Sequence, residues 1–382
     1  MMKAYLDNGA TTIVSETVVE KMNEAFRSTY GNPSSMHHMG VEAEKLIKHS
    51  KKILSKAIKA TPEEIIFTSG GTEANNLAIQ GFLNHSSCRK KHIITTQIEH
   101  PSVLNVFQKY ESLGYKVTYL KVDEKGKIDI KELESTLCDD TALVSVMYVN
   151  NEIGTIQDLP LISKTIKKHS KAAFHVDAVQ ALGKVECHVK KQGIDMMTFS
   201  SHKIHGPMGV GALFVKKGIL LEPLFIGGGQ QKGIRPGTEN APGVVGFATA
   251  CEEGTATLNE TQKTLISLRD YFVEEVLKID GAKYNGNYDA PHIANISFPN
   301  MRGEVLLHVL ESKDIYVSTG SACASKNKTY SHVLEAIGLD EKHMEGAIRF
   351  SFSKYTTKEM IEYTLQTLKE SIQELDAIIK GR

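Results

Sequence analysis

A lysine between two short apolar runs is the residue best placed for covalent chemistry. Lys203 lies in Ser-Ser-His-Lys-Ile-His-Gly-Pro, between runs typical of strands at 196–200 and 210–215. Lysines are usually solvent-exposed, but this one is directed into the crevice at the carboxyl end of a sheet. Desolvation and a neighbouring cation lower the pKa of such an amine, which then attacks an aldehyde to form an imine. The sequence therefore predicts a covalent bond between Lys203 and an aldehyde ligand.

Asp177 is the candidate partner for an electron-accepting ring. It ends the β-rich run 173–177. A pyridine ring withdraws electrons best when its nitrogen stays protonated beside a fixed carboxylate. At about 4 Å the attraction is worth roughly 4 kcal/mol for an effective dielectric constant near 20, or about three pKa units. The alternative is that Asp177 is a loop or cap residue.

Two glycines and a threonine predict a phosphate site. Gly70-Gly71-Thr72 lies where the run 65–69 turns into a helical pattern. Glycines there expose backbone N–H groups, and the helix N-terminus adds partial positive charge. The alternative is a tight turn in which Thr72 is the helix N-cap. The run lacks the spacing of a Walker loop or a dinucleotide fingerprint, which favours a mononucleotide-sized phosphate.

Cys323 is the candidate nucleophile. It lies in a run of small and polar residues, 318–328, that offers no apolar face to bury a thiol. Buried, inert packing is the common fate of a free cysteine, but Lys326 and Lys328 favour the thiolate here. The remaining cysteines have no such setting and are interpreted as packing or incidental surface thiols: Cys88, Cys138, Cys187 and Cys251.

Alternating β-rich and amphipathic runs must position these side chains. Helices are expected at 102–113 and 158–168, and strands at 65–69, 92–96, 116–122, 142–149, 173–177, 196–200 and 210–215. This pattern predicts an α/β fold with a mostly parallel seven-stranded sheet and helices on both faces. About ten residues separate the last two strands, too few for a helical crossover, so the seventh strand is expected to be antiparallel.

Polar residues follow these strands at the edge where ligands bind in open α/β sheets. The sequence places Glu99-His100, Asn150-Asn151-Glu152, His175-Val176-Asp177 and Ser200-Ser201-His202-Lys203 there. One edge therefore gathers a lysine, an aspartate, histidines and hydroxyls. An alternative for His100 is a stacked or core histidine. If His100 transfers protons, its expected contribution is roughly 10²- to 10⁴-fold in rate.

A smaller α+β domain is expected after the glycine cluster at 227–229. Helical patterns at about 257–279 and 357–380 flank a mixture of helices and short strands. We expect residues 1–16 to join the small domain, 17–255 to form the large cofactor-binding domain, and 256–382 to form the small domain carrying the Cys323 loop. Without a low-complexity linker the two parts are expected to pack closely.

The composition argues against several other functions. Lys plus Arg (45) equals Asp plus Glu (45), so no overall field favours nucleic acid or an anionic membrane. Nothing resembles a signal peptide or a run of 18 uncharged apolar residues. The cysteines are scattered without a Cys-x-x-Cys pair, which argues against a disulfide framework or a structural zinc. We expect a cytoplasmic enzyme that binds no metal, no membrane and no nucleic acid directly.

Ordered blocks along the chain resemble the cysteine desulfurases, members of the class V branch of the aspartate-aminotransferase fold. The resemblance extends from Tyr5-Leu6-Asp7 to Arg349-Phe350-Ser351. The other blocks are Gly31-Asn32-Pro33-Ser34-Ser35, Ser69-Gly70-Gly71-Thr72-Glu73, Glu99-His100, Val149-Asn150-Asn151-Glu152-Ile153-Gly154, His175-Val176-Asp177, Ser200-Ser201-His202-Lys203-Ile204-His205-Gly206-Pro207, Arg235-Pro236-Gly237-Thr238-Glu239-Asn240 and Gly320-Ser321-Ala322-Cys323.

The resemblance implies pyridoxal 5'-phosphate as cofactor, in the fold called type I for such enzymes. It implies that Lys203 is the Schiff-base lysine, that His100 stacks on the pyridine ring, that Asp177 pairs with the ring nitrogen, and that Gln180 contacts the phenolic oxygen. The residues that it implies bind the phosphate are Gly71, Thr72, Ser200 and His202. Substrate binding is implied for Asn32, Asn151 and Arg349, and the planar fork of an arginine suits a carboxylate.

The implied reaction converts L-cysteine to L-alanine. Cysteine displaces Lys203 and loses its α-proton, the ring stores the electrons, and the Cys323 thiolate attacks the substrate sulfur. The resulting persulfide passes to an acceptor protein. Family members are homodimers in which a threonine of the second subunit reaches the phosphate, and Thr238 occupies that motif.

Rival interpretations remain. One is a selenocysteine lyase or another class V enzyme such as an aminotransferase, and Cys323 argues against the aminotransferase. The other is a catalytically idle binding partner, against which the retained Lys203, Asp177 and Arg349 argue.

Two departures from the housekeeping iron–sulfur type of the family concern the sulfur acceptor. In that type a Leu-Glu-Pro-containing stretch follows the cysteine, whereas this sequence has Lys326-Asn327-Lys328-Thr329-Tyr330. The sequence also stops at Arg382 after the last helical pattern, without the tail that docks the iron–sulfur scaffold. We therefore expect a tRNA-thiolating enzyme as acceptor rather than that scaffold. The alternative is that Lys326 and Lys328 form only a solvated stretch.

Overall fold

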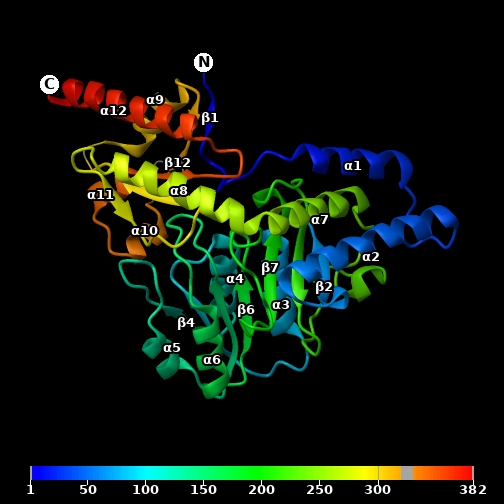
Figure 1. Ribbon diagram of the computed structural model, residues 1–382. Coiled ribbons are helices and arrows are strands. Elements are labelled where there is room, and N and C mark those ends of the chain that lie inside the picture. Colours follow the sequence, from blue (N-terminus) through cyan, green and yellow to red (C-terminus); the bar gives the residue numbers. More distant parts are fainter. Residues whose placement is uncertain (1, 300, 320–329, 381–382) are drawn as a thin grey trace.

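A seven-stranded sheet forms the centre of the computed structural model, which describes residues 2–299, 301–319 and 330–380 (Figure 1). The strand order is β2-β8-β7-β6-β5-β3-β4. The bounds are β2 (Ile65–Thr68), β3 (His92–Thr96), β4 (Lys116–Leu120), β5 (Thr141–Met147), β6 (Ala173–Asp177), β7 (Met196–Ser200) and β8 (Gly211–Val215). Only β8 runs antiparallel to its neighbours among these described strands. The predicted mostly parallel sheet and its antiparallel seventh strand are confirmed.

Side chains that alternate along each strand fill two cores, one on each face of the sheet. One face carries Leu143, Ala173 and Met196, and the other carries Val144, Phe174 and Met197. Both sets are buried, so the strands read as continuous apolar runs, as expected when helices cover both faces.

Helices cover both faces and give three layers. On one face lie α3 (Gly71–Asn84) and α4 (Pro101–Ser112). The other face is covered by α2 (His38–Ile58), α5 (Ile130–Thr136), α6 (Leu159–His169) and α7 (Ala241–Ala256). The bounds of α4 and α6 lie within one residue of the predicted helices. Three short 3₁₀ turns complete this part: η1 (Pro62–Glu64), η2 (Ser201–Lys203) and η3 (Gln230–Gly233).

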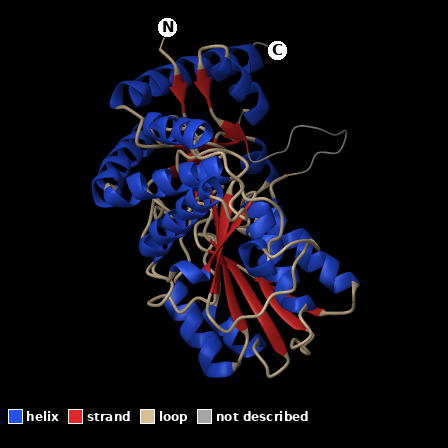
Figure 2. Cartoon of the chain, turned by 90° about the vertical axis from the view of Figure 1, so that its right-hand side faces the viewer, coloured by secondary structure: helices blue, strands red, loops and turns tan. Residues whose placement is uncertain are grey.

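A second sheet, antiparallel and four-stranded among the described residues, has its own apolar core (Figure 2). Its order is β12 (Ser318–Thr319), β13 (Ala347–Ser351), β10 (Ile293–Ser297) and β9 (Lys283–Asn285). The surrounding helices are α8 (Leu258–Val276), α9 (Gly303–Glu311), α10 (His332–Ala336), α11 (Glu341–Glu345) and α12 (Lys358–Lys380). The expected helices at about 257–279 and 357–380 correspond to α8 and α12.

The N-terminal segment connects the two sheets. β1 (Ala4–Tyr5) pairs in parallel with β11 (Ile315–Tyr316). The chain then hydrogen-bonds to the end of β13, where the Asn8 amide donates to the Ser351 carbonyl at 2.9 Å, and to η2, where the Thr12 hydroxyl donates to the His202 carbonyl at 2.9 Å. Residues 4–15 therefore span both sheets beside the carboxyl ends of the central strands.

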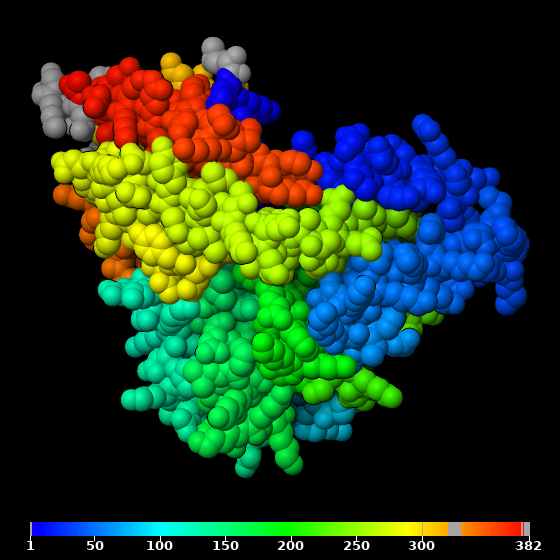
Figure 3. Space-filling view, viewed as in Figure 1, coloured from blue at the N-terminus to red at the C-terminus, as the bar shows by residue number. Residues whose placement is uncertain are grey.

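Helices α1 (Glu16–Ser28) and α2 project from one side of the molecule as an arm (Figure 3). α1 packs on α7 through buried Val18, while several apolar side chains of the arm are exposed, including Phe26, Tyr30 and Met36. Within the described residues, no helix has the length and apolarity required to span a bilayer.

Candidate active site

A cavity of about 320 Å³ lies beyond the carboxyl ends of β5, β6 and β7. This volume is within the range of small-molecule sites. The cavity brings together ten of the predicted residues: Gly71, Thr72, His100, Asn151, Asp177, Gln180, Ser200, His202, Lys203 and Arg349. Residues from both sheets and from the N-terminal segment therefore line a single chamber.

Lys203 is the third residue of η2, the short turn that follows β7. Its ammonium group donates to the carbonyl oxygens of Gly9 at 2.7 Å and Ala10 at 2.6 Å. Burial and the positive charge of Arg349 lower the pKa of Lys203 to about 8, although Asp7 and Asp177 oppose the shift. Lys203 is thus the desolvated lysine with a neighbouring cation that its sequence context predicts.

Asp177 ends β6 and lies on the cavity wall with 5% of its surface exposed. One carboxylate oxygen accepts a hydrogen bond from the Asn75 amide at 2.7 Å, and the other accepts from the Val179 backbone N–H at 3.0 Å. Asn75 belongs to α3 and also donates to Ser102 at 2.8 Å. These donors fix a carboxylate that faces the cavity, and Asp177 caps no helix.

The N-terminus of α3 forms the opposite end of the cavity. Its N-cap is Gly70, which has no side chain, and Thr72 lies within the first turn. The alternative interpretation of Thr72 as the N-cap is therefore wrong. A Cβ atom at Gly71 would lie 2.7 Å from the Val179 side chain, so only glycine fits. The first N–H groups of a helix have no intrahelical acceptor, which leaves them available to an anion.

Two further polar residues line this end of the cavity. Ser200 ends β7, and His202 follows it in η2. Burial, together with Lys203 and Lys184, lowers the pKa of His202 to about 4, so its ring is neutral near pH 7. Its Nδ1 atom lies 3.1 Å from the Thr11 hydroxyl. Hydroxyls, a neutral imidazole and backbone N–H groups form a donor set suited to a phosphate dianion.

His100 is the N-cap of α4 and is exposed toward the cavity. Its Nδ1 atom accepts a hydrogen bond from the Ser102 backbone N–H at 3.1 Å and lies 2.8 Å from the Ser102 hydroxyl. Partial desolvation lowers the pKa of His100, Asp177 opposes this shift, and Lys203 adds to it. His100 is therefore not a core histidine.

Arg349 extends from β13 into the cavity. Its guanidinium donates to the Asn151 carbonyl at 2.9 Å and to Asp7 at 2.7 Å. The buried Nε atom has no partner among the described residues. A fixed guanidinium with an unused N–H is suited to bind a carboxylate that enters the cavity.

Two predicted residues that the structure describes do not line this cavity. Thr238 and Asn32 are exposed, and the Asn32 side chain accepts from the Ser34 backbone N–H at 2.9 Å. Cys323 lies outside the described residues.

His175 is a correction to the sequence interpretation, which placed it at the polar edge. It lies inside β6, hydrogen-bonded between Ser145 at 2.8 Å and Thr198 at 3.1 Å, and burial lowers its pKa to about 3. It is a neutral core histidine because it lies two residues before the end of the strand.

Several residues of the site were assigned no role from the sequence. Asp7 orients Arg349, Asn75 orients Asp177, and the carbonyls of Gly9 and Ala10 hold Lys203. Lys184 lies behind Gln180, to which it donates at 3.0 Å, and burial lowers its pKa well below the usual range. A signal exists for Asn75, because it lies four residues, one turn of α3, after Gly71.

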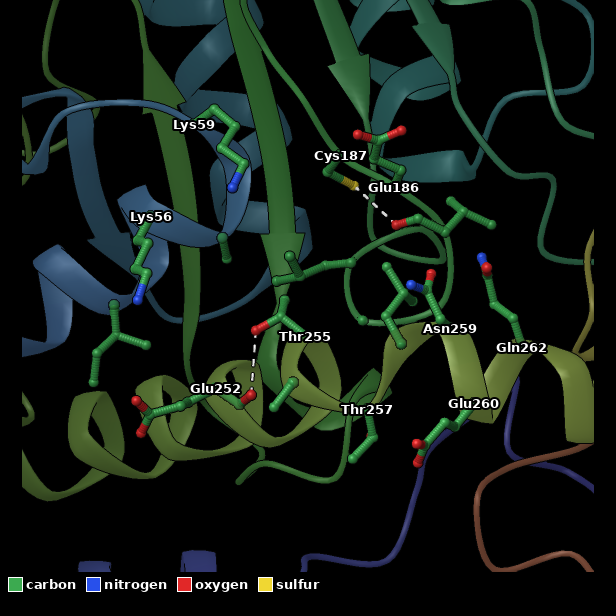
Figure 4. A pocket seen from close by; sticks show the side chains of 17 residues that line it. Lys56, Lys59, Glu186, Cys187, Glu252, Thr255, Thr257, Asn259, Glu260 and Gln262 are labelled. Atoms are coloured by element: carbon green, nitrogen blue, oxygen red, sulfur yellow. Dashed lines mark hydrogen bonds between the residues drawn. The ribbon is translucent and has the colours of Figure 1, made fainter.

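A larger cavity, of about 880 Å³, lies between the end of α2, residues 182–187 and the junction of α7 and α8 (Figure 4). Cys187 lies at its edge, where burial raises the pKa of the thiol, and burial likewise raises the pKa of Cys251. Both thiols stay protonated near neutral pH, as expected for packing residues. None of the predicted site residues lines this second cavity.

Comparisons with known proteins agree with this fold and site. The family model "Aminotransferase class-V" matches residues 4–364. The phosphate donors, the low-pKa lysine and the buried carboxylate of the cavity suit the phosphate, aldehyde and ring nitrogen of pyridoxal phosphate. The chain belongs to the class V aminotransferase family, whose cofactor is pyridoxal phosphate.

Relatives narrow the assignment within that family. A cysteine desulfurase of Nostoc sp. is 44% identical over 381 residues, covering 99% of this chain and 95% of that protein. Cysteine desulfurase IscS of Dictyoglomus turgidum is 42% identical over 379 residues, covering 98% and 96%. A solved NifS-like protein superposes with a TM-score of 0.93 at 40% identity, covering 97% of this chain and 100% of that one. Within the family, the chain is a cysteine desulfurase.

Proposed function

We propose that Lys203 carries the cofactor covalently and that Cys323 takes the sulfur of free L-cysteine as a persulfide. The observation that carries this proposal is the convergence, in one cavity, of a lysine with a pKa of about 8, a buried carboxylate and the N-terminus of a glycine-capped helix. Pyridoxal phosphate supplies an aldehyde for attachment and a ring that accepts the electrons released at the substrate α-carbon.

Each residue acts on one part of the cofactor. Thr72, Ser200, His202 and the first N–H groups of α3 hold the phosphate. Asp177, fixed by Asn75, keeps the ring nitrogen protonated. Gln180 would bind the phenolic oxygen, and His100 would cover the ring face and move the substrate proton.

The substrate carboxylate is bound by Arg349 and Asn151. Arg349 is already oriented by Asp7 and by the Asn151 carbonyl, and its Nε–H remains available. A preoriented guanidinium loses little conformational freedom on binding. This clamp fixes the α-carbon of the amino acid near Lys203 and His100.

Cys323 completes the reaction by nucleophilic attack. Its thiolate forms a bond to the sulfur of the bound cysteine, the bond between that sulfur and the substrate β-carbon breaks, and the β-carbon keeps the bonding electrons. Protonation of the substrate carbon skeleton gives alanine. Cysteine and the Cys323 thiol are thus converted to alanine and a Cys323 persulfide with no external oxidant.

The test is incubation of the purified protein with cysteine, followed by measurement of alanine and of persulfide by alkylation and mass spectrometry. We expect equal amounts of both in a single turnover. Cys323→Ala should keep cofactor and cysteine binding but form no persulfide, while Cys138→Ala, which removes an exposed cysteine, should behave like the parent. Desulfuration by Cys323→Ala at the parent rate contradicts the proposal.

We also propose that the protein is a homodimer with composite sites. Thr238 is exposed and outside the cavity of its own subunit, which suits a residue that reaches the partner's phosphate. Exposed apolar side chains of the arm and of a neighbouring loop provide an interface: Val19, Phe26, Tyr30, Met36, Phe225 and Ile226. Apolar groups exposed in this number mark association surfaces. Asn32, on the same arm, would then belong to the partner's substrate site.

The two cores support a division of the chain that we propose as its domains. Core residues from Val18 to Cys251, together with Ala290, pack around the large sheet, whereas Leu6 packs with the core of the small sheet. Residues 17–255 then form the large domain, and 256–382, joined by 1–16, form the small one. We place the enzyme in the cytoplasm, where a catalytic thiol stays reduced.

For the acceptor we propose a tRNA-thiolating enzyme rather than an iron–sulfur scaffold, supported by the basic sequence Lys326-Asn327-Lys328. The test measures, in parallel, the transfer of sulfur from labelled cysteine to each acceptor. Faster transfer to the thiolating enzyme is expected, and it should slow when both lysines are replaced by glutamate. Preferential transfer to the scaffold contradicts the proposal.

A further inference from the structure

Helix α10 lies against the wall of the active-site cavity. Its Val333 and Leu334 are buried in a small apolar cluster with Ile98, just after β3, and Met147, the last residue of β5. Met147 also lines the cavity. The apolar contacts therefore fix α10 beside the segment that connects β3 to His100.

Two polar contacts complete this junction. The His332 Nε2 atom lies 2.9 Å from the Glu99 backbone carbonyl, and the Ser331 hydroxyl donates to the Glu152 carboxylate at 2.5 Å. A carbonyl oxygen only accepts hydrogen bonds, so His332 Nε2 carries the hydrogen and donates it. Ser331 is also the N-cap of α10, which holds His332 at the first position of the helix.

Glu99 is held from the opposite side as well. Its carboxyl group is fully buried, and one oxygen accepts from the Thr96 hydroxyl at 2.7 Å and from the Met147 backbone N–H at 2.8 Å. The side chain of Glu99 is thus anchored in the sheet, while its carbonyl is anchored by His332. Both ends of the residue that precedes His100 are fixed.

The carbonyl that His332 contacts belongs to the peptide group joining Glu99 to His100. The His100 ring is in turn oriented by the Ser102 N–H, which donates to its Nδ1 atom. Loss of the His332 contact frees this peptide plane to rotate and leaves a largely desolvated carbonyl without its donor. The position of the ring over the cavity then becomes less defined.

We propose that His332 is a positioning residue for His100 and acts through the hydrogen bond to the Glu99 carbonyl. The inference rests on the proposed role of His100 in proton transfer. His332 is not among the described residues that line the cavity, and it reaches His100 through the Glu99 carbonyl and through a charge effect that lowers the pKa of His100. Its effect on catalysis is therefore indirect.

The test compares full-length holoenzyme variants. His332→Leu removes the donor, whereas His332→Gln keeps an N–H group at a similar reach. His332→Asn, whose amide is too short to reach, replaces the leucine variant if that variant does not fold. His308→Leu, on the exposed face of α9, is the matched control. The measurements are kcat, KM for cysteine, the thermal unfolding midpoint and the visible circular dichroism of the bound cofactor.

We expect His332→Leu to lower kcat by roughly 10- to 100-fold through misplacement of His100, with KM changed less than about twofold because the carboxylate clamp is untouched. The cofactor dichroism should change, His332→Gln should recover both signals, and His308→Leu should match the parent. An unchanged kcat and dichroism in His332→Leu, or a glutamine variant as impaired as the leucine one, overturns the inference. Parent activity in a parallel His100→Gln variant instead refutes the proposed role of His100.

Discussion

Lys203 owes its low pKa to residues distant in sequence. Burial by the cavity walls and the charge of Arg349, 146 positions later, lower its pKa to about 8. About a tenth of the amine is then neutral at pH 7, compared with about one in three thousand for an ordinary lysine. Because only the neutral amine attacks an aldehyde, the cavity raises the reactive fraction by roughly 300-fold.

The first prediction follows from this pKa. Cofactor-free protein mixed with pyridoxal phosphate should acquire its visible absorption faster as the pH rises from 6 to 8, because deprotonation produces the neutral amine. The rate should level off above pH 8 to 9. Arg349→Gln removes a cation that lowers the pKa of Lys203. The midpoint of the pH profile should therefore shift to higher pH in this variant. A profile that keeps rising to pH 10 in the parent contradicts the pKa assignment.

The second prediction concerns the attachment itself. Lys203→Ala should abolish the covalent link, detected after borohydride reduction and peptide mass spectrometry, and lower activity by at least about 10²-fold. Lys184→Met is the control, because Lys184 is the other buried lysine nearby but donates to Gln180. Its variant should keep the link at residue 203. A reduced adduct on another lysine in the Lys203→Ala protein contradicts the assignment.

The sequence predicted the residues that follow strands but not those that orient them. Lys203, Asp177 and Thr72 each lie next to a recognisable strand or glycine turn. Asp7, Gly9 and Ala10 reach the site across 190 to 350 positions through hydrogen bonds. Such contacts leave no periodic pattern in the sequence. The sequence interpretation misplaced His175, because a difference of two residues along the strand decides whether a side chain lies in the core or in the cavity.

The N-terminus of α3 is the element that gives the cavity its anion preference. Gly70 provides no capping side chain and Gly71 admits no Cβ atom, so the first turn stays open toward the cavity. Thr72 adds a hydroxyl to these N–H groups. In the proposed site, the helix dipole and the hydroxyl would act on the same phosphate.

The third prediction tests this element. Thr72→Val keeps the shape of the side chain but removes the hydroxyl, and a hydrogen bond to a charged group is worth about 1.5–3 kcal/mol. Cofactor affinity, measured by titrating cofactor-free protein, should fall by roughly 10- to 100-fold. Thr72→Ser, which restores the hydroxyl, should bind within about threefold of the parent. Equal affinity in the valine variant excludes Thr72 from the phosphate site.

Among the elements, sequence patterns located the seven strands of the central sheet and the orientation of β8. Most of these strands are short β-rich runs with buried side chains, and a connection of ten residues leaves only a hairpin between β7 and β8. β1, β11 and β12 have two residues each, too few for any periodicity. Their pairing depends on chain segments brought together by the fold.

At the scale of the whole molecule, the arm of α1 and α2 exposes apolar side chains that a monomer leaves in water. Ile226 is completely exposed, and Phe26 and Tyr30 are more than half exposed. Burial of such groups contributes about 25 cal/mol per Å².

The fourth prediction is a stable dimer in sedimentation experiments. Phe26→Asp combined with Ile226→Asp should shift the equilibrium to monomers and weaken cofactor retention, because Thr238 of the partner subunit is lost. Thr238→Ala alone should loosen the cofactor while the dimer persists. The paired control is Leu113→Asp, which changes an exposed apolar residue at the end of α4. A fully active monomer contradicts the composite site.

The ion pair between Asp7 and Arg349 limits when the active site can form during synthesis of the chain. The two partners are separated by 342 positions, so Asp7 is synthesised well before Arg349. At about 5–20 residues per second, synthesis of the intervening chain takes roughly 20 to 70 s. During that interval the carbonyls of Gly9 and Ala10 and the end of β13 have not met. The cofactor site can therefore be complete only after Arg349 has been synthesised.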